Sequence, residues 1–250
     1  MLFSSITKPK RIFPLILLLL CGCGEVRDGN VSETVQNVSE ITQNISEQAQ
    51  KTESAETAEI SAVRNDGVLM FGFTADEFVN SFNAVYSDEY GEVYLTPVSQ
   101  WNCYEACSPL VDNDGMAYCF TEDREILSMP NITLFTDDNG SVYEIMVTFD
   151  DHGYQDWLNK KFGIISMNMI ETVLPDMADT EAFYRELYAL AGTNFYGDDY
   201  KFPPSDFYRS GDVGLYSYYG GGTINICAVP ADDELENELS RADCVIHGIE

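Results

Sequence analysis

The chain has 250 residues, 45% of them hydrophobic, and its 42 acidic and 13 basic residues give a formal net charge of −29 at pH 7. A field this negative repels the phosphates of nucleic acids, so DNA and RNA binding are excluded as functions. The length and the apolar content are sufficient for one domain with a substantial core.

The first residues combine positive charge with a short apolar run. Lys8, Lys10 and Arg11 give a basic start, and a short apolar run over residues 12–20 follows them. The run is too short to span a bilayer, which takes about 20 apolar residues. A basic start, a brief apolar run and a small residue before the cleavage point are the parts of a secretory signal peptide.

The signal ends in Leu20-Cys21-Gly22-Cys23, which resembles the lipobox of bacterial lipoproteins. The resemblance implies that residues 1–22 are removed and that a diacylglyceryl group is attached to the sulfur of Cys23. Two acyl chains anchor a protein stably, whereas a single chain does so only marginally. We therefore expect a lipid-anchored protein on the extracytoplasmic face of the cell membrane, without a transmembrane helix.

Two alternatives to a lipoprotein signal remain, a plain secreted protein that is cut elsewhere and an uncleaved anchor. Cys21 competes with Cys23 as the lipid acceptor. The residue before Cys21 is the bulky Leu20, however, where a small residue is expected.

Residues 23–65 are predicted to form a tether. They are poor in aromatic residues and rich in Ser, Thr, Glu, Gln and Asn, and such a segment cannot bury enough apolar area to offset its ordering entropy. Residues 30–50 repeat with a heptad-like period that places Val31, Val38 and Ile45 at one position. A coiled coil that pairs copies of the chain is therefore the alternative to a disordered or weakly helical tether.

Residues 66–250 are predicted to form a single globular domain. It opens with a helix, because Thr74 and Glu77 form a capping box and Phe73 is placed to pack on Phe78. The clearest hairpin spans residues 131–149, where apolar side chains alternate after an Asn-Gly turn. The first helix is expected to span residues 74–86. The other expected elements are strands at 92–98 and 116–120, helices at 157–174 and 180–190, a loop at 193–211, a hairpin at 212–229 and a short acidic helix at 232–243.

This order of elements predicts an α+β fold. Hairpins imply antiparallel pairing, and helices that are bunched along the chain do not form alternating β-α-β units. We expect an antiparallel sheet of about six strands with about three helices on one face. Its other face is then left to solvent or to a binding partner.

Five cysteines follow the signal, and an odd number leaves at least one thiol without a partner in the same chain. Cys227 and Cys244 are the predicted disulfide, because one ends a strand and the other lies on the returning tail; a fully reduced set is the alternative. Cys103 and Cys107 lack the spacing of a zinc pair, and the chain has only two histidines. We expect neither a metal nor another cofactor.

Motifs for catalysis are sparse. The segment Asp-Asp-His-Gly at 150–153 is compatible with an envelope hydrolase that uses His152 as a base, but the chain has no GxSxG nucleophile elbow. The Asp-rich segments at 112–115 and 137–140 lack the ligand spacing of an EF-hand and fit turns better.

The loop at 193–211 is rich in Tyr and Phe and is the predicted binding surface. We expect Tyr196, Tyr200 and Phe207 to contact a partner, because large rings supply contact area at a low entropic cost. The alternative is that these rings pack the long loop against the sheet.

These features predict a membrane-anchored envelope lipoprotein. Its domain is expected to bind a protein, a peptide or a cell-wall component rather than to act as an enzyme. The envelope hydrolase that uses His152 and an assembly role through the heptad segment are the two alternatives.

Overall fold

The structure is a computed structural model that describes residues 60–65, 67–107, 110, 114–123, 129–150, 156–191, 195–196 and 204–249. The predictions for Cys23, for the heptad segment, for His152 and for Tyr200 lie outside the described residues.

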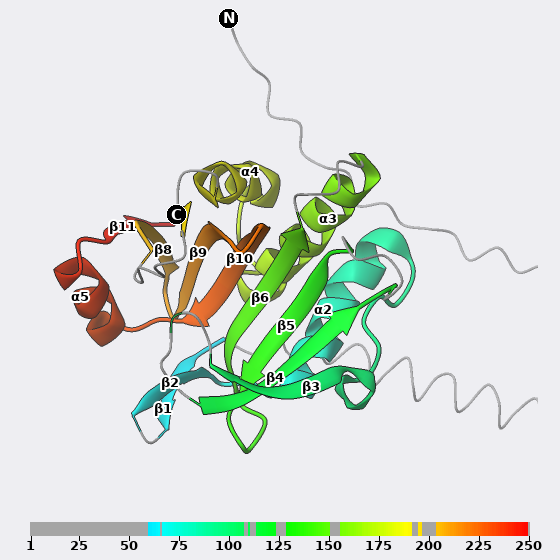
Figure 1. The fold of residues 1–250 in the computed structure, drawn as a ribbon, viewed down its shortest axis with the longest axis horizontal. Helices are drawn as coiled ribbons and strands as arrows, with labels where there is room; N and C mark the ends of the chain where they lie inside the picture. Colours follow the sequence, from blue (N-terminus) through cyan, green and yellow to red (C-terminus); the bar gives the residue numbers. More distant parts are fainter. Residues whose placement is uncertain are drawn as a thin grey trace, which may run out of the picture. The chain divides into compact units, whose positions relative to one another are not determined.

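A small hairpin precedes the first helix, and the remaining strands belong to one large sheet (Figure 1). The elements, in chain order, are β1 (Ala62–Asn65), β2 (Val68–Phe71), α2 (Ala75–Tyr90), the 3-10 helix η1 (Val98–Gln100), β3 (Asn102–Cys107), β4 (Asp114–Thr121), β5 (Asn131–Thr136), β6 (Val142–Asp150), α3 (Asp156–Val173), α4 (Thr180–Ala191), β7 (Phe195–Tyr196), β8 (Asp206–Ser210), β9 (Val213–Gly220), β10 (Thr223–Pro230), α5 (Asp233–Arg241) and β11 (Val245–Gly248).

The large sheet has the strand order β11-β8-β9-β10-β6-β5-β4-β3, and β7 pairs with the far end of β9. Every neighbouring pair from β8 to β3 is antiparallel. The two pairings β11–β8 and β7–β9 are parallel. Strands β3 and β11 are therefore the two edges of this path.

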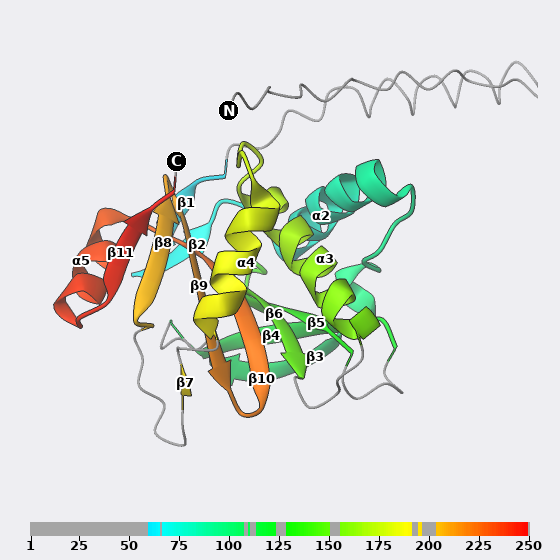
Figure 2. The ribbon, with the colours of Figure 1, turned by 90° about the horizontal axis from the view of Figure 1, so that it is seen from above.

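Three helices pack on one face of the sheet. Helix α4 contacts β9 and β10, α3 contacts β6 and β10, and α2 packs beside α3. Figure 2 shows α2, α3 and α4 on the same side of the strands. The core between these layers is apolar and includes the fully buried side chains Phe82, Ile145, Phe162, Met169 and Leu215. The predicted α+β fold with helices on one face is confirmed.

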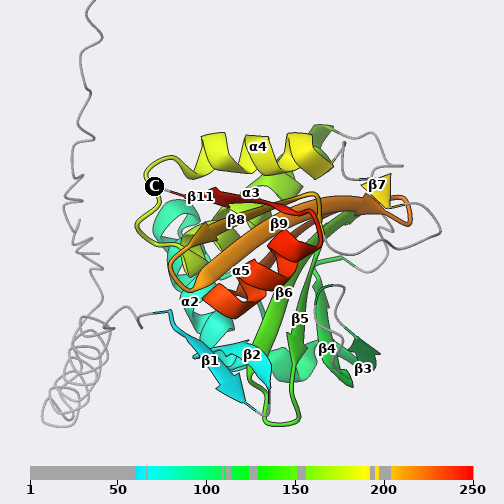
Figure 3. The ribbon, with the colours of Figure 1, turned by 90° about the vertical axis from the view of Figure 1, so that its left-hand side faces the viewer.

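Helix α5 is separate from this helical layer. It contacts β11 at the edge of the sheet, and Figure 3 shows both elements beside β8 and β9. Most of its side chains are exposed, and Leu239 is the buried one. The predicted short acidic helix is therefore confirmed as an element at the sheet edge.

The start of α2 follows the capping-box prediction. The Thr74 backbone N–H donates to Glu77 Oε2 at 2.8 Å, and the Thr74 hydroxyl accepts from the Glu77 backbone N–H at 3.4 Å. The rings of Phe73 and Phe78 stack with centroids 6.2 Å apart. The helix runs one turn beyond its predicted end, to the point where Gly91 takes a φ of 76°.

Both predicted hairpins form. Strands β5 and β6 pair around a turn in which Gly140 has a φ of 81°. Strands β9 and β10 pair around Gly221 and Gly222, whose φ angles are 62° and 86°. Positive φ angles strain residues with a Cβ, so these glycines fix the turns.

The strand predicted at 92–98 is wrong. Its backbone is held by the side chain of Asn83 on α2, whose Nδ2 donates to the Leu95 carbonyl at 2.9 Å. Asn83 Oδ1 accepts from the backbone N–H groups of Tyr94 and Leu95 at 3.2 and 2.8 Å. Because a side chain satisfies these backbone groups, the segment does not need a neighbouring strand.

Strands β1, β7 and β8 were not predicted from the sequence. Strand β1 lies inside the segment predicted as tether, so the folded domain begins before residue 66. The segment at 193–211, predicted as a loop, contains β7 and β8. Strand β8 lies between β11 and β9, within the sheet.

Candidate functional site

We call the side of the sheet that faces away from α2, α3 and α4 the helix-free face, although Leu239 of α5 packs in one cluster with Tyr216 and Cys227 at its β8–β10 end. No described helix lies over β4, β5 and β6 on this side (Figure 1). Because side chains alternate along a strand, each strand gives every second residue to this face. Its residues include Tyr104, Cys119, Thr133, Glu144, Met146, Thr148, Tyr216, Tyr218, Asn225 and Cys227.

A carboxyl group lies buried at the centre of the helix-free face. Glu144 on β6 and Tyr216 on β9 are both fully buried. The Tyr216 hydroxyl donates to Glu144 Oε1 at 2.6 Å, across the intervening strand β10. A buried carboxyl group is costly without hydrogen bonds, so this contact stabilises Glu144 in the sheet.

Cys227 completes this cluster from β10. It is directly opposite Tyr216 in the register of β9 and β10, and it is fully buried. Burial and then the charge of Glu144 raise the pKa of the Cys227 thiol well above its ordinary value. The nucleophile in cysteine chemistry is the thiolate, so the cluster lacks the activation of a catalytic cysteine.

The same environment acts on the phenol. Burial, followed by the charges of Cys227 and Glu144, raises the pKa of Tyr216 well above its ordinary value. The hydroxyl therefore keeps its proton, which is the proton that it donates to Glu144. The geometry suits a fixed hydrogen bond rather than proton exchange at neutral pH.

A polar strip crosses the helix-free face near the turn between β9 and β10. The Thr148 hydroxyl donates to Asn225 Oδ1 at 2.8 Å, and Asn225 Nδ2 lies 3.1 Å from the Thr223 hydroxyl oxygen. The Thr223 hydroxyl in turn donates to the Gly220 carbonyl at 2.7 Å. These side chains give this part of the face hydrogen-bonding groups in fixed positions.

The face is most open toward the β3 edge. The side chain of Tyr104 is 49% exposed. Partial burial and then the neighbouring Cys119 thiol raise the pKa of Tyr104, whereas a hydrogen bond with Thr133 lowers it. Tyr104 thus offers an accessible ring whose hydroxyl lies close to polar groups of β4 and β5.

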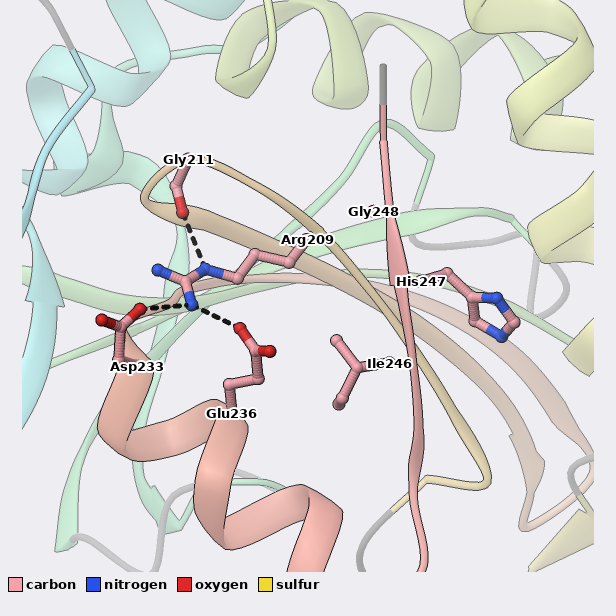
Figure 4. A pocket seen from close by; sticks show the side chains of 7 residues that line it. All are labelled: Arg209, Gly211, Asp233, Glu236, Ile246, His247 and Gly248. Atoms are coloured by element: carbon pink, nitrogen blue, oxygen red, sulfur yellow. Dashed lines mark hydrogen bonds and ion pairs between the residues drawn. The ribbon is translucent and has the colours of Figure 1, made fainter.

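A second feature is a hollow of about 390 Å³ between β8, β11 and α5. Figure 4 shows the Arg209 guanidinium directed at Asp233 and Glu236 of α5. Its Nη1 donates to these carboxylates at 2.9 and 2.5 Å, and its Nε donates to the Gly211 carbonyl at 2.9 Å. The guanidinium is therefore already compensated, and its contacts fasten α5 to β8.

His247 also lines this hollow, but its ring points away from the Arg209 pairs (Figure 4). Its Nε2 lies 2.9 Å from Asp206 Oδ1, and its ring stacks on Tyr208 with centroids 4.6 Å apart. The Tyr208 hydroxyl donates to Glu186 on α4 at 2.8 Å. These contacts hold β11 against β8, so we assign the hollow a structural role.

Two of the predicted binding residues, Tyr196 and Phe207, lie in described strands. Tyr196 lies in β7, opposite Gly220 in the parallel pairing with β9. Phe207 is fully buried in β8, so its predicted role as an exposed contact is wrong. Its ring covers Gly214, where an added Cβ would come within 2.0 Å of Phe207 Cζ. This close approach places Phe207 in the core.

The predicted disulfide between Cys227 and Cys244 is also wrong, because both residues are free thiols. They belong to one buried cluster, yet their contacts differ. Cys227 lies against Tyr216 and Glu144, whereas the Cys244 sulfur lies 3.8 Å from the Val245 carbonyl oxygen. The two cysteines therefore share a buried cluster, but their sulfur atoms are not bonded to each other.

Sequence reasoning missed Glu144. Its only signal is a single carboxylate inside the otherwise apolar run Tyr143-Glu144-Ile145-Met146-Val147. Alternation alone assigns it to the face opposite Ile145, where an exposed charge is the usual expectation. Its burial follows from Tyr216, which lies 72 residues later in the chain.

No family model matches this chain, and neither the curated proteins nor the solved structures contain a significant match. Among the described helices, none has both the length and the apolar character needed to cross a membrane. Within the described residues, no group of three or more His, Cys, Asp or Glu side chains is arranged to hold a metal ion.

Proposed function

We propose that this chain is a bacterial envelope lipoprotein that holds a binding domain at the membrane surface. In this proposal Cys23 carries the lipid, the segment before β1 is the tether, and the α+β domain binds a protein, a peptide or a cell-wall component through its helix-free face.

The support for the anchor lies in the sequence. Leu20 and Gly22 flank the lipid acceptor in the order of a lipobox, after a basic start and a short apolar run. The strongly acidic composition fits a protein that stays soluble and unaggregated at the membrane surface.

The support for binding is the helix-free face. One side of the sheet is covered by α2, α3 and α4, whereas the other presents the exposed Tyr104 and the partly exposed Thr148, whose hydroxyl is held by the buried Asn225. Tyrosine supplies contact area at a low entropic cost, and fixed polar groups supply orientation. The raised pKa of Cys227 favours binding over thiol chemistry at this face.

Photo-crosslinking in intact cells tests this proposal. A photoreactive phenylalanine analogue replaces Tyr104 on the helix-free face, and a matched variant carries it at the exposed Glu181 on α4. We expect a discrete crosslinked product from position 104 and none from position 181. Equal products from both positions, or none from position 104, would count against binding at this face.

A further inference from the structure

Three tyrosine rings gather at the end of α2, on the opposite side of the sheet from the helix-free face. Tyr86 and Tyr90 lie on α2, and Tyr94 lies in the segment that follows it. The centroid of Tyr86 is 4.6 Å from that of Tyr90 and 5.0 Å from that of Tyr94. The Tyr94 ring meets Phe120 of β4 edge-on at 5.5 Å, so the group is anchored to the core.

Carboxylates surround these rings, and together the two sets form the Tyr–Glu patch. Partial burial, then a hydrogen bond to Glu89 and its charge, raise the pKa of Tyr90 to about 12. Burial and then the charges of Glu92, Glu122 and Glu89 raise the pKa of Tyr86. The last turn of α2 has no basic residue, so nothing in that turn compensates these acids.

One lysine of the chain already lies over a tyrosine ring and beside a carboxylate. The ammonium of Lys161 on α3 lies 5.3 Å from the centre of the Tyr94 ring. The same ammonium forms an ion pair with Glu122. An aromatic face beside a carboxylate attracts a cation through the ring quadrupole and the negative charge together.

The outer end of the Tyr–Glu patch repeats this combination without a cation of its own in the described contacts. Tyr90 is 38% exposed and Val93 is 70% exposed. The exposed Glu89 lies beside Tyr90, and the exposed Glu92 lies beside Tyr86, whose ring is 4.6 Å from that of Tyr90. An accessible ring next to two exposed carboxylates is chemically complementary to an ammonium group on an apolar stem.

We propose that the Tyr–Glu patch binds a cationic peptide segment by accepting a lysine side chain over Tyr90, between Glu89 and Glu92. The lysine stem packs on Val93, and its ammonium takes the position relative to Tyr90 that Lys161 takes relative to Tyr94. This site is separate from the helix-free face, so the proposal does not depend on the proposed function and is tested independently of it.

Fluorescence anisotropy of a labelled hexalysine peptide tests the proposal on the full-length protein in detergent, at one fixed salt concentration. Tyr90→Leu removes the aromatic face without changing the charge, and Tyr90→Phe restores the ring. We expect Tyr90→Leu to weaken hexalysine binding about threefold and Tyr90→Phe to bind like the wild type.

A charge-matched comparison separates the patch from the overall negative charge. The Glu89→Gln/Glu92→Gln variant removes two charges from the patch, and the Asp138→Asn/Glu238→Gln variant removes two exposed charges elsewhere. We expect only the first pair to weaken binding more than about twofold. Melting curves confirm that every variant is folded, and these exposed charge changes are compatible with folding.

Two results would overturn the proposal. One is that Tyr90→Leu binds hexalysine as tightly as Tyr90→Phe does. The other is that both charge-removing variants weaken binding to the same extent, because hexalysine is then held by net charge and not by the patch.

Discussion

The hydrogen bond from Tyr216 stabilises the carboxyl group of Glu144 inside the sheet. The carboxyl group is fully buried, and the Tyr216 hydroxyl reaches it from two strands away. An unsatisfied buried polar group costs about 1–3 kcal/mol, which is a large share of the stability of a domain. The pair therefore locks the relative positions of β6 and β9 on the helix-free face.

Tyr216→Phe tests this interaction. The ring remains, but the buried carboxyl group of Glu144 loses a donor, so we expect the free energy of unfolding to fall by about 1–3 kcal/mol. Tyr104→Phe is the matched control, because Tyr104 is exposed and its hydroxyl can be replaced by water. Chemical denaturation of the two variants gives the difference, and equal stabilities would show that the Glu144 contact contributes little.

Phe207 also acts at the residue scale, through packing. Its side chain is fully buried against Gly214, in a cluster that includes Tyr216 and Cys227. Phe207→Ala should destabilise the domain by about 3–5 kcal/mol, as expected for a large core side chain. Denaturant unfolding measures the loss, with Tyr104→Ala as an exposed-ring control whose loss should be much smaller. A Phe207→Ala protein with wild-type stability would contradict the placement of Phe207 in the core.

Local patterns could predict only part of the candidate site. The alternation Tyr143-Ile145-Val147 was visible in the sequence and placed β6 in the sheet. Burial of Glu144 was not visible, because its partner Tyr216 belongs to a strand that joins the sheet through β10. The roles of Phe207 and Cys227 likewise depend on strand order, which single-strand patterns do not contain.

At the scale of elements, the caps and turns were the most predictable features. The Thr74 capping box and the Asn139-Gly140 turn act within a few residues, so local sequence determines them. Strand β8 and the segment at 92–98 were mispredicted for the opposite reason. Strand β8 pairs on one side with β11, from the end of the chain, and the segment at 92–98 is held by the Asn83 side chain of α2.

The contacts of strand β1 show that it belongs to the folded domain. Arg64 pairs with Asp232, the N-cap of α5, at 2.8 Å, and the Ala62 backbone N–H donates to Asp212 at 3.1 Å. The strand therefore ties the start of the domain to its last helix.

Truncation tests the boundary. A chain that starts at Ile60 should melt at the same temperature as one that starts at Gly24, because it keeps β1. A chain that starts at Asp66 loses β1 and its contacts with Asp212 and Asp232, and should melt about 3–8 °C lower. Identical midpoints for all three chains would mean that β1 adds no stability. A lower midpoint for the Ile60 chain would mean that the tether docks on the domain.

For the whole molecule, paired carboxylates set the response to acid. Burial alone would raise the pKa of Asp206, but hydrogen bonds from Ser205 and His247 hold it below its ordinary value. A carboxylate with a lowered pKa in the folded state stabilises the fold above its unfolded pKa of about 3.9. That stabilisation is lost as the pH falls through the folded-state pKa.

Comparison of the wild type with Asp206→Asn isolates this contribution from the repulsion among the other acids. The wild type should be more stable at pH 5 and above, and the difference should shrink as the pH falls below about 4. Glu238→Gln, at an exposed position of α5, should show no such pH-dependent difference. A constant gap between the wild type and Asp206→Asn from pH 6 to pH 2 would contradict the assignment.

Intact mass spectrometry of the mature protein from membranes tests the proposal that Cys23 anchors a folded binding domain to the membrane. We expect an N-terminal Cys23 with a diacylglyceryl mass on its sulfur, and for Cys23→Ala an unprocessed chain that retains residues 1–22. An unmodified N-terminus downstream of Cys23 in the membrane-derived wild type would contradict lipid anchoring through Cys23.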